Sequence, residues 1–344
     1  MRAAVVHATG DIEIDEVADP VVREPTDAVV RVHASGICGT DLWLYRGDQQ
    51  VEPGRRAGHE FVGEIIDAGP EVRTVAVGDF VIAPFRWSDG TCPYCLAGLH
   101  SSCPNGGVWG TGGVDGGQGE AVRVPFADGT LVRVPPPVHD SMLPKLLALS
   151  DVLATGRHAA RCARVEHGSV AAVIGDGAVG LCAVLAAKSL GAQQVIALSH
   201  HTERAEIASR FGATDIVSER GEEAVARVLE LTGGLGASAV LECVGGAQTW
   251  QTAIDIARDG ATIGYVGKPV GIDGLPLTTL YSRNIGVAGG LSPARAYLPE
   301  LLDDVLAGRI DPSPIFDTEV VLDDVARGYA AMADRKSIKV MVRP

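Results

Sequence analysis

Strand-like and helix-like segments alternate at short intervals from about residue 169, and this alternation limits the fold more than any other feature. Strands that alternate with helices of this length fold into a parallel sheet with helices on both faces. We therefore expect a doubly wound α/β domain over 151–289. The alternating segments run over 169–174, 178–190, 194–198, 202–211, 215–217, 222–231, 239–242, 247–257 and 261–266.

The rest of the chain has a different texture. Residues 1–150 contain short strand-like runs separated by Gly, Pro and Asp, which predicts a β-rich domain, and 141–163 has helical spacing. Residues 290–344 contain two helix-like stretches and a final strand, too little for a separate core, so we expect them to pack on the first domain. A chain of 344 residues is long enough for two cores. The predicted domains are 1–150 with 290–344, and 151–289.

The composition narrows the class of partner and the compartment. The chain has 29 Lys and Arg against 43 Asp and Glu, a net charge of −14, which argues against nucleic acid or an anionic membrane as partner. The N-terminus has no apolar run of the kind that marks a signal peptide, so we expect a cytoplasmic protein. Thiols stay reduced there, and the seven cysteines therefore indicate metal binding or catalysis before disulfides.

Gly175, Gly177 and Gly180 form the pattern G-x-G-x-x-G between a predicted strand and a predicted helix. In such a turn the first glycine allows the tight bend, the second lets a pyrophosphate approach the backbone, and the third lets helix and strand pack closely. The amides at the helix N-terminus, where Ala178 and Val179 lie, face the phosphates. The segment therefore predicts a dinucleotide-binding site.

The end of the next strand indicates which dinucleotide is bound. Proteins that bind NAD usually carry an Asp or Glu there, which bonds the ribose 2′-hydroxyl, whereas this chain carries Ser199. The hydroxyl of Ser199, the imidazole of His200 and the guanidinium of Arg204 suit a 2′-phosphate, which a carboxylate would repel. We therefore expect NADP(H) in preference to NAD(H). The alternative is that the histidines at 200 and 201 are exposed loop residues.

Cys38 lies in the segment Gly-Ile-Cys-Gly-Thr-Asp, and His59 lies in Gly-His-Glu. Thiolate sulfur and imidazole nitrogen are zinc ligands, and a catalytic zinc site has three protein ligands with one position open. With the pattern G-H-E-x2-G-x5-G-x2-V at 58–72, the chain resembles the zinc-dependent medium-chain alcohol dehydrogenases over essentially its whole length. The resemblance implies a GroES-like catalytic domain, a Rossmann cofactor domain, and hydride transfer between an alcohol, or its ketone or aldehyde, and a nicotinamide cofactor.

The resemblance also implies the ligands of the catalytic Zn²⁺. It assigns Cys38 and His59, and it assigns Asp151 because this residue stands four positions before the Thr of the segment Thr155-Gly156. Glu60 is expected beside the metal, as an additional ligand or as a carboxylate next to it. An Asp at position 151, together with the serine at the ribose site, is typical of the bacterial NADP-dependent secondary-alcohol dehydrogenases. The alternative for Asp151 is a helix N-cap without metal contact.

The proton path and the cofactor position follow from the same resemblance. Thr40 occupies the position of the hydroxyl that passes on the alcohol proton, and Thr155 helps to position the nicotinamide. Many relatives end the proton relay with a His five residues after the Cys, where this chain has Trp43. The outer part of the path is therefore expected to differ, with ribose hydroxyl and water in place of the imidazole.

Cys92, Cys95 and Cys103 correspond to the lobe that holds a structural zinc in the family, where four cysteines are spaced C-x2-C-x2-C-x7-C. In this alignment Gly98 takes the third position and the final gap is shorter. A structural zinc site needs four ligands, and His100 offers a fourth donor in the frame C-x2-C-x4-H-x2-C. The alternative is a retained loop with free thiols.

The chain before the α/β domain also contains a glycine-rich stretch and three aromatic residues on predicted loops. The stretch 106–119 holds eight glycines in fourteen residues, so we expect an irregular loop rather than a helix. Phe85, Trp87 and Trp109 lie on predicted loops, where they either line a cleft for a partly apolar substrate or pack within the loops.

The expected function is that of a zinc-dependent alcohol dehydrogenase or carbonyl reductase that uses NADP(H) and works as a homodimer or homotetramer on a small alcohol or carbonyl compound. Alternatives are a polyol or sugar-alcohol dehydrogenase that uses NAD, a zinc-free quinone or enone reductase of the same fold, and a cofactor-binding protein without catalysis. Retention of Cys38, His59 and Asp151 together favours the zinc enzyme over the last two.

Overall fold

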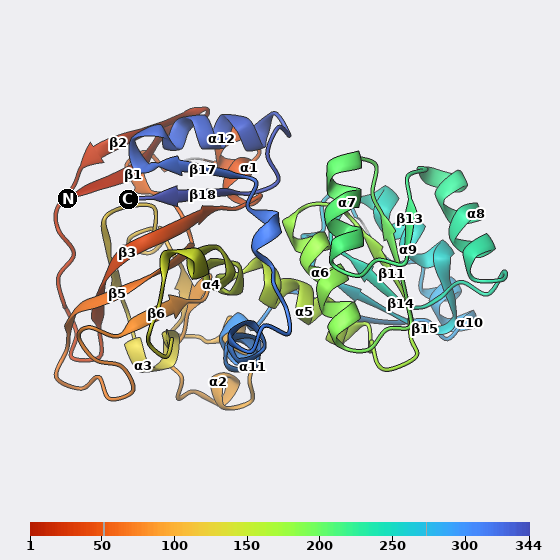
Figure 1. The fold of residues 1–344 in the computed structure, drawn as a ribbon, viewed down its shortest axis with the longest axis horizontal. Helices are drawn as coiled ribbons and strands as arrows, with labels where there is room; N and C mark the ends of the chain where they lie inside the picture. The colour runs from red at the N-terminus through yellow and green to blue at the C-terminus, as the bar shows by residue number, and fades with distance from the viewer. Residues whose placement is uncertain (51, 273) are drawn as a thin grey trace. The chain divides into compact units, whose positions relative to one another are not determined.

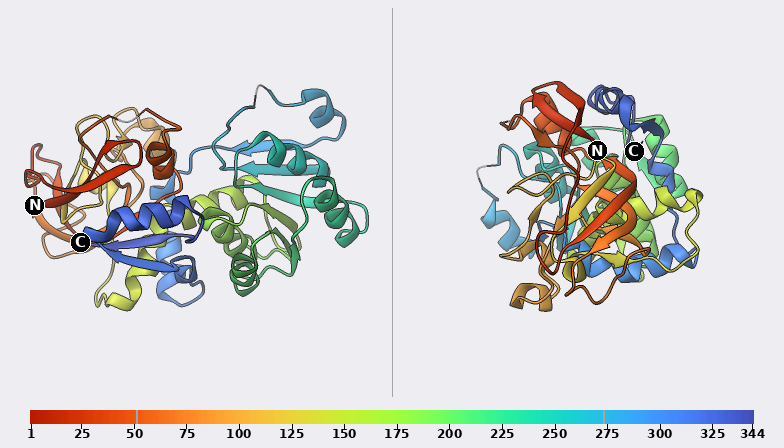
Figure 2. Two further views of the ribbon diagram at one scale, coloured as in Figure 1. Left: turned by 90° about the horizontal axis from the view of Figure 1, so that it is seen from above. Right: turned by 90° about the vertical axis from the view of Figure 1, so that its left-hand side faces the viewer.

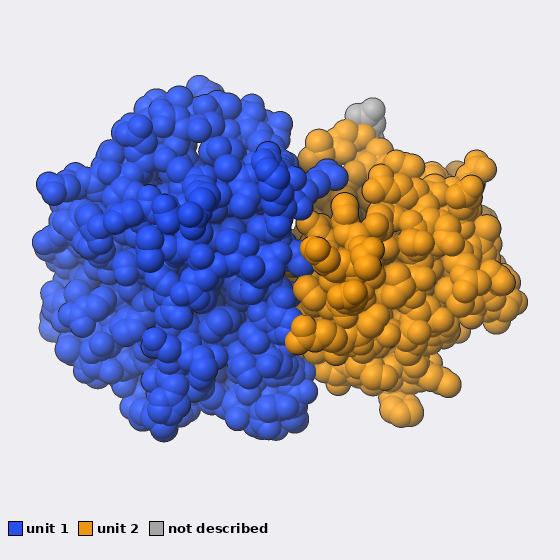
Figure 3. All heavy atoms as spheres, turned by 45° about the horizontal axis from the view of Figure 1, so that its top comes forward, with its two compact units in different colours: residues 1–151, 293–344 blue, residues 152–292 orange. Residues whose placement is uncertain are grey.

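The computed structural model describes residues 1–50, 52–272 and 274–344. The chain divides into two compact units, coloured separately in Figure 3. Unit 1 comprises Met1–Asp151 and Pro293–Pro344, and unit 2 comprises Val152–Ser292. Among the described residues, none of the helices combines the length and the apolar character that crossing a bilayer requires.

Unit 1 is rich in short strands and contains both ends of the chain (Figures 1 and 2). Its elements from the N-terminal part are β1 (Arg2–Ala8), β2 (Asp11–Glu16), β3 (Ala28–Ile37), α1 (Asp41–Arg46), β4 (Arg55–Arg56), β5 (Glu60–Ala68), β6 (Phe80–Ala83), β7 (Arg86–Trp87), α2 (Pro93–Leu96), η1 (His100–Ser102), β8 (Gly107–Val108), β9 (Ala121–Val124), α3 (Ala127–Thr130), β10 (Val132–Arg133), η2 (Asp140–Met142) and α4 (Leu143–Ser150). Those from the C-terminal part are α11 (Ala294–Leu306), η3 (Ser313–Ile315), β17 (Thr318–Val321), η4 (Leu322–Asp324), α12 (Val325–Ala333) and β18 (Val340–Arg343).

The largest sheet of unit 1 joins the two parts of the chain. Its strand order is β10-β6-β5-β3-β18-β17, with β9 also paired to β3. The C-terminal strand β18 runs antiparallel to the end of β3, with Val340 opposite Ile37. Since β3 leads into Cys38 and β5 begins at Glu60, this pairing brings residues from the start and the end of the sequence to one end of the sheet.

Two apolar clusters of described residues contribute to the core of unit 1. One surrounds Phe61, Trp87 and Trp109, whose rings meet edge to face or tilted, with centroids 4.9 and 5.4 Å from the Trp109 ring. The other lies between α12 and the strands β1, β17 and β18, around the buried side chain of Tyr329. Trp87 and Trp109 are therefore core residues, and the packing interpretation of these side chains is the correct one.

The glycine-rich stretch 106–119 is irregular apart from the two residues of β8, as expected. Its second half packs against residues 57–61, a segment that includes His59 and the start of β5. A Cβ at Gly116 would lie 2.1 Å from the carbonyl oxygen of Ala57, and one at Gly117 would lie 2.3 Å from the ring of Phe61. Side chains there would push this stretch off β5, so the glycines are a packing requirement of the site region.

Unit 2 is a doubly wound α/β domain, as the alternation predicts. Its elements are α5 (Val152–Cys162), β11 (Val170–Ile174), α6 (Ala178–Ser189), β12 (Gln194–Leu198), α7 (Thr202–Arg210), β13 (Asp215–Val217), α8 (Gly221–Leu231), β14 (Ala237–Glu242), α9 (Ala247–Ile256), β15 (Ala257–Tyr265), α10 (Leu277–Ser282) and β16 (Gly286–Gly289).

The sheet of unit 2 is parallel throughout, with the order β13-β12-β11-β14-β15-β16. In chain order of its strands this is 3-2-1-4-5-6, the order of the dinucleotide-binding Rossmann fold. Helices α6 and α7 lie on one side of the sheet, and α8 and α9 lie on the other (Figure 1). The order reverses beside β11, and ligands bind at this switch point in folds of this kind.

The helical stretch expected over 141–163 is interrupted. Helix α4 ends at Ser150, and Asp151 has φ −144° and ψ −75°, so the backbone leaves the helical region before α5 begins. The apolar spacing on both sides of the break is helical, which is why the sequence pattern did not reveal it. The break falls at the residue that the family resemblance assigns to the metal.

Candidate active site

Unit 1 brings four of the predicted residues together at one end of its largest sheet. Cys38 follows β3, His59 and Glu60 stand at the start of β5, and Asp151 lies at the helix break. Each offers one ligand atom, and these atoms lie within 4.8 Å of one another. All four residues are buried.

The donor atoms converge closely enough to share one ion. The Sγ atom of Cys38 and the Nε2 atom of His59 each lie 3.5 Å from Oδ2 of Asp151. Sulfur, nitrogen and oxygen donors in one buried group suit Zn²⁺, a borderline-soft cation that accepts all three. The residues present therefore fit the zinc ion that the resemblance implies.

Asp41 orients two of these donors. Its Oδ1 atom is 3.0 Å from Nδ1 of His59, and its Oδ2 atom accepts a hydrogen bond of 2.9 Å from the amide of Cys38. Burial raises the pKa of Asp41, but the imidazole of His59 outweighs it and the pKa is lowered. A carboxylate on Nδ1 leaves Nε2 free for a metal, an arrangement common to histidine ligands. The motif Gly-Ile-Cys-Gly-Thr-Asp contained this residue, but our sequence analysis did not assign it.

Lys339 holds the carboxylate of Glu60. Its ammonium lies 2.7 Å from Oε2 and donates a hydrogen bond of 2.8 Å to Oε1, with 1% and 0% of the two side chains exposed. Burial lowers the pKa of Lys339, but Glu60 outweighs it and the pKa is raised. A Cβ at Gly36 would come within 2.2 Å of Oε2, so glycine is required there. Sequence analysis missed Lys339, which is 279 residues away from its partner.

The residues proposed for the proton path lie next to this group in the chain. Thr40 is exposed and stands at the N-cap of α1. Trp43, in α1, is half-buried. The aromatic residues at 87 and 109 are not part of this region, because they belong to the core described above.

The glycine turn of unit 2 has the geometry that phosphate binding needs. It connects β11 to α6, and Gly175 has φ +112°. A Cβ at Gly180 would lie 1.9 Å from the carbonyl oxygen of Gly175, whereas a Cβ at Gly177 would meet no atom within 4 Å. The surrounding protein therefore leaves no room for a side chain at the first and third glycines. The second glycine faces open space at the N-terminus of α6, where Ala178 and Val179 lie. Thr155 lies in α5 of the same unit.

The predicted ribose site contains a carboxylate that sequence analysis missed. Asp176, the middle residue of Gly-Asp-Gly, accepts hydrogen bonds from the Ser199 hydroxyl at 3.1 Å and from the His200 amide at 3.2 Å. The guanidinium of Arg204 lies 3.2 Å from its other oxygen. Asp176 and His200 line a pocket together with Gly175, Leu198, Glu219 and Arg220. The donors expected for a 2′-phosphate are present, but their contacts go to the carboxylate of Asp176.

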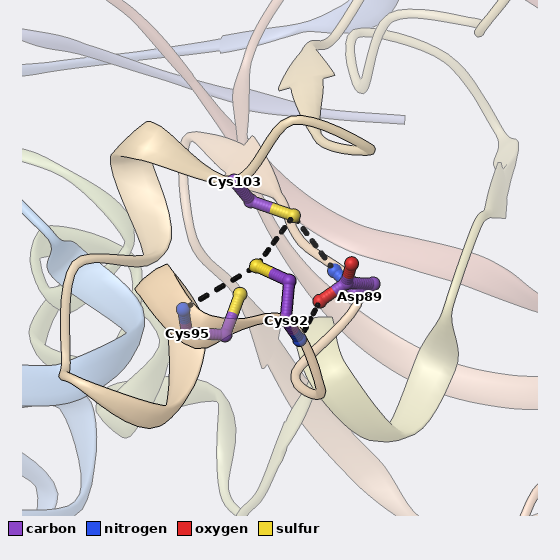
Figure 4. Close-up of side chains that lie close together, drawn as sticks. All are labelled: Asp89, Cys92, Cys95 and Cys103. Carbon is purple, nitrogen blue, oxygen red and sulfur yellow. Dashed lines mark hydrogen bonds between the residues drawn. The ribbon is translucent and has the colours of Figure 1, made fainter.

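The cysteine lobe forms a second candidate metal site, with a different frame from the one expected. Cys92, Cys95 and Cys103 gather with Asp89, and their donor atoms lie within 4.8 Å of one another (Figure 4). The structure places His100 outside this group. The spacing from Asp89 onward is D-x2-C-x2-C-x7-C, so the family pattern is complete with Asp in the first position. The sequence alignment started at Cys92 and therefore did not include Asp89.

Hydrogen bonds shape the lobe around these donors. The Sγ atoms of Cys92 and Cys103 are 3.8 Å apart, and the amide of Asp89 donates to Sγ of Cys103 at 3.4 Å. The carboxylate of Asp89 accepts from the Cys92 amide at 2.9 Å and from the Asn105 side chain at 2.7 Å. Burial raises the pKa of Asp89, but these donors outweigh it and hold the pKa below its usual range. The carboxylate is therefore charged, as a metal ligand must be.

Comparisons with known proteins agree with this arrangement. Residues 24–136 match the family model described as alcohol dehydrogenase GroES-like domain, and residues 178–307 match the model described as zinc-binding dehydrogenase. The first model covers the candidate metal ligands at 38 and 59 and the cysteine lobe. The second covers the helix after the glycine turn and most of the parallel sheet.

Similar proteins extend over the whole chain. A probable zinc-binding alcohol dehydrogenase of Mycobacterium tuberculosis is 36% identical over 100% of this chain and 89% of its own length. A zinc-type alcohol dehydrogenase of Aspergillus flavus is 32% identical over 100% and 81%. The solved structure of an alcohol dehydrogenase from Thermus sp. ATN1 has a TM-score of 0.94 and 35% identity, covering 100% of this chain and 99% of that chain.

Both the domain models and the full-length relatives name the same kind of enzyme. Their similarity also explains why a β-rich unit with a buried Cys, His and Asp occurs in one chain with a Rossmann unit. The chain belongs to the zinc-dependent medium-chain alcohol dehydrogenase family, whose GroES-like and Rossmann domains correspond to units 1 and 2.

Proposed function

We propose that the protein transfers hydride between a small alcohol, or its ketone or aldehyde, and a nicotinamide cofactor, with Zn²⁺ held by Cys38, His59 and Asp151. The observation that carries the proposal is the convergence of Sγ of Cys38 and Nε2 of His59 on Oδ2 of Asp151 at 3.5 Å each. Three donors leave one position of a tetrahedral ion for the substrate oxygen. When bound, Zn²⁺ supplies Lewis-acid polarisation of that oxygen.

The residues around the three donors have separate tasks in this proposal. Asp41 fixes the orientation of the His59 ring, because it accepts from Nδ1. Glu60 stays at the edge of the group, where Lys339 compensates its charge. The Thr40 hydroxyl takes the alcohol proton and passes it to solvent, which its exposed position at the N-cap of α1 supports. Because position 43 is a tryptophan and not a histidine, the outer part of the proton path is proposed to run through water and ribose hydroxyl groups.

The glycine turn of unit 2 would hold the cofactor, with the amides at the N-terminus of α6 and the open position at Gly177 available to its pyrophosphate. Thr155 would help to position the nicotinamide. We propose NADP(H) in preference to NAD(H), and this is supported by Ser199, His200 and Arg204, which offer donors to a 2′-phosphate.

Asp89, Cys92, Cys95 and Cys103 are proposed to hold a structural zinc. The support is a closed set of four donors with the complete family spacing. The guanidinium of the half-buried Arg86 is near Cys103, since burial lowers the pKa of Arg86 and the charge of Cys103 opposes this shift.

We further propose a homodimer or homotetramer in the cytoplasm. Strand β16 is the last strand of the six-stranded sheet, and an edge strand can pair with a second copy. All seven cysteines carry free thiols, which suits a reducing compartment. Sedimentation velocity across a concentration series measures the assembly, and a monomer at all concentrations would contradict this part.

Steady-state kinetics on the purified, zinc-loaded protein tests the function. We expect oxidation of NADPH with ketones or aldehydes from a substrate panel, and loss of at least about a hundredfold in kcat/KM in Cys38→Ser together with loss of one zinc. Cys162→Ser is the matched control, since this half-buried thiol lies in α5 and belongs to none of the proposed metal groups. Turnover that survives Cys38→Ser would instead favour the zinc-free quinone or enone reductase.

A further inference from the structure

The carboxylate of Asp176 lies at the ribose end of the proposed cofactor site, and it comes from an unusual position in the sequence. It belongs to the glycine turn after β11, whereas the acidic residue of NAD-binding Rossmann folds stands at the end of the next strand. That strand, β12, ends at Leu198 and is followed by Ser199. The structure places the Asp176 carboxylate 3.1 Å from the Ser199 hydroxyl. The missing acidic group is thus supplied from the neighbouring turn.

The contacts of Asp176 fix its carboxylate in this place. One oxygen accepts from the Ser199 hydroxyl and from the His200 amide, and the other lies 3.2 Å from the guanidinium of Arg204. Only 16% of the Asp176 side chain and 15% of the Arg204 side chain are exposed. The residues that line the neighbouring pocket belong to unit 2 and include Asp176 and His200 but not Arg204. A ligand in this pocket therefore meets the carboxylate of the pair.

The charge of Asp176 is retained at neutral pH. Burial raises the pKa of its carboxyl, but the guanidinium of Arg204 and the hydroxyl of Ser199 outweigh it, and the pKa is lowered. A charged carboxylate accepts a hydrogen bond from a ribose hydroxyl and repels a phosphate. It also pairs with Arg204, whose guanidinium carries a permanent positive charge.

We propose that Asp176 is the residue that determines discrimination between the two nicotinamide dinucleotides: it accepts the 2′-hydroxyl of NAD(H) and opposes the 2′-phosphate of NADP(H). The inference rests on the proposed function, because it assumes that the pocket holds the adenosine ribose. The preference for NADP(H) provided by Ser199, His200 and Arg204 is then smaller than these donors alone would give. Removing the negative charge releases Arg204 for the phosphate.

Binding measurements on the full chain test this directly. The dissociation constants of NADPH and NADH are measured by fluorescence titration for the wild type and for Asp176→Asn. We expect the ratio Kd(NADPH)/Kd(NADH) to fall by about tenfold or more, as for the loss of a charged hydrogen-bond partner. Should Asp176→Asn fail to fold, Asp176→Ser carries the same expectation, because serine also lacks the charge.

Two further variants separate the role of Asp176 from a general effect of charge. Glu219→Gln removes another carboxylate that lines the same pocket, and it is expected to change the ratio by less than about threefold. Asp176→Asn combined with Ser199→Asp returns a carboxylate to the end of β12, and it is expected to restore the wild-type ratio or favour NADH further.

The outcomes distinguish the inference from the proposed function. If neither dinucleotide binds the wild type, the cofactor site itself is wrong. If both bind but Asp176→Asn changes the ratio by less than about twofold, or raises it, the proposed role of Asp176 is overturned while the dehydrogenase function stands. A fall in the ratio that Glu219→Gln reproduces in full would also overturn it.

Discussion

The buried pair of Glu60 and Lys339 places a compensated charge beside the proposed metal ligands. Both side chains are buried almost completely, and the ammonium also lies 3.3 Å from the carbonyl oxygen of Ile37. Such a pair contributes little net stability compared with an apolar pair, but removal of one partner leaves an uncompensated charge in the interior. Burial raises the pKa of Glu60 and the ammonium of Lys339 opposes this shift, so Lys339 is proposed to act as a positioning residue for the Glu60 carboxylate.

The first prediction concerns this pair. Lys339→Met is expected to lower the free energy of unfolding of the protein by about 3–5 kcal/mol, because Glu60 loses its buried partner. Urea unfolding followed by circular dichroism measures the change. Lys336→Met is the control, since this lysine is 74% exposed and should change the free energy by less than about 0.5 kcal/mol. Equal effects of the two substitutions would contradict the role of Lys339.

The second prediction concerns Asp41. Asp41→Asn keeps the size of the side chain but weakens the acceptor for Nδ1 of His59, so we expect the affinity for the zinc of the Cys38 group to fall about 10–100-fold. Competition with a chromophoric chelator measures the affinity without any need for turnover. Asp67→Asn, an exposed carboxylate on β5, is the control. An unchanged affinity in Asp41→Asn would show that the carboxylate only supports the local backbone.

At the residue level, the sequence predicted the donors with local motifs and missed those brought in by tertiary structure. Cys38, His59 and the glycines of the turn stand in short motifs whose chemical role can be predicted from the sequence. Lys339 reaches Glu60 only because β18 pairs with β3, and no local pattern indicates this pairing. Asp176 was visible inside the glycine turn, but its side-chain direction toward Ser199 depends on the fold of the turn.

At the level of elements, the cysteine lobe is a loop region without a sheet core of its own. Cys92 is the N-cap of α2 and its sulfur accepts from the amide of Cys95, and η1 follows at His100–Ser102. Such short elements bury little apolar surface, so a bound metal is the natural source of order. The sequence pattern placed Cys92, Cys95 and Cys103 in one lobe but did not include Asp89, because Asp was not considered as a substitute for the first cysteine.

The third prediction tests this frame. The wild type should bind about two zinc ions per chain, and Asp89→Ala should bind about one, because a structural site needs four ligands. His100→Ala should keep both ions, since the structure places this histidine outside the donor group. Metal analysis by mass spectrometry after dialysis measures the content. Loss of zinc in His100→Ala with retention in Asp89→Ala would support the frame that starts at the cysteines.

Elements with regular periodicity were predicted well, and the irregular junctions were not. The alternation of strands and helices identified the parallel sheet of unit 2, whereas the strand order and the switch point beside β11 came from the structure. The break between α4 and α5 escaped prediction, because apolar residues continue at helical spacing on both sides of Asp151. This break turns a residue from a helical stretch toward the metal group.

At the level of the whole molecule, two units with different architectures carry different parts of the proposed reaction. Unit 1 holds the candidate metal ligands, and unit 2 holds the glycine turn and the pocket proposed for the dinucleotide. Hydride transfer requires both parts, so a variant that disables either unit should abolish the reaction while the other unit keeps its ligand. Zinc binding and dinucleotide binding are accordingly expected to be separable by mutation.

Direct observation of hydride transfer tests the central claim. NADPH or NADH carrying deuterium at C4 of the nicotinamide is incubated with the zinc-loaded protein and a ketone, and the alcohol is analysed by mass spectrometry and NMR. We predict deuterium on the carbinol carbon with the wild type, and none above background with Cys38→Ser. An alcohol without deuterium, or deuterated alcohol formed equally by Cys38→Ser, would contradict the zinc-dependent hydride transfer proposed for this protein.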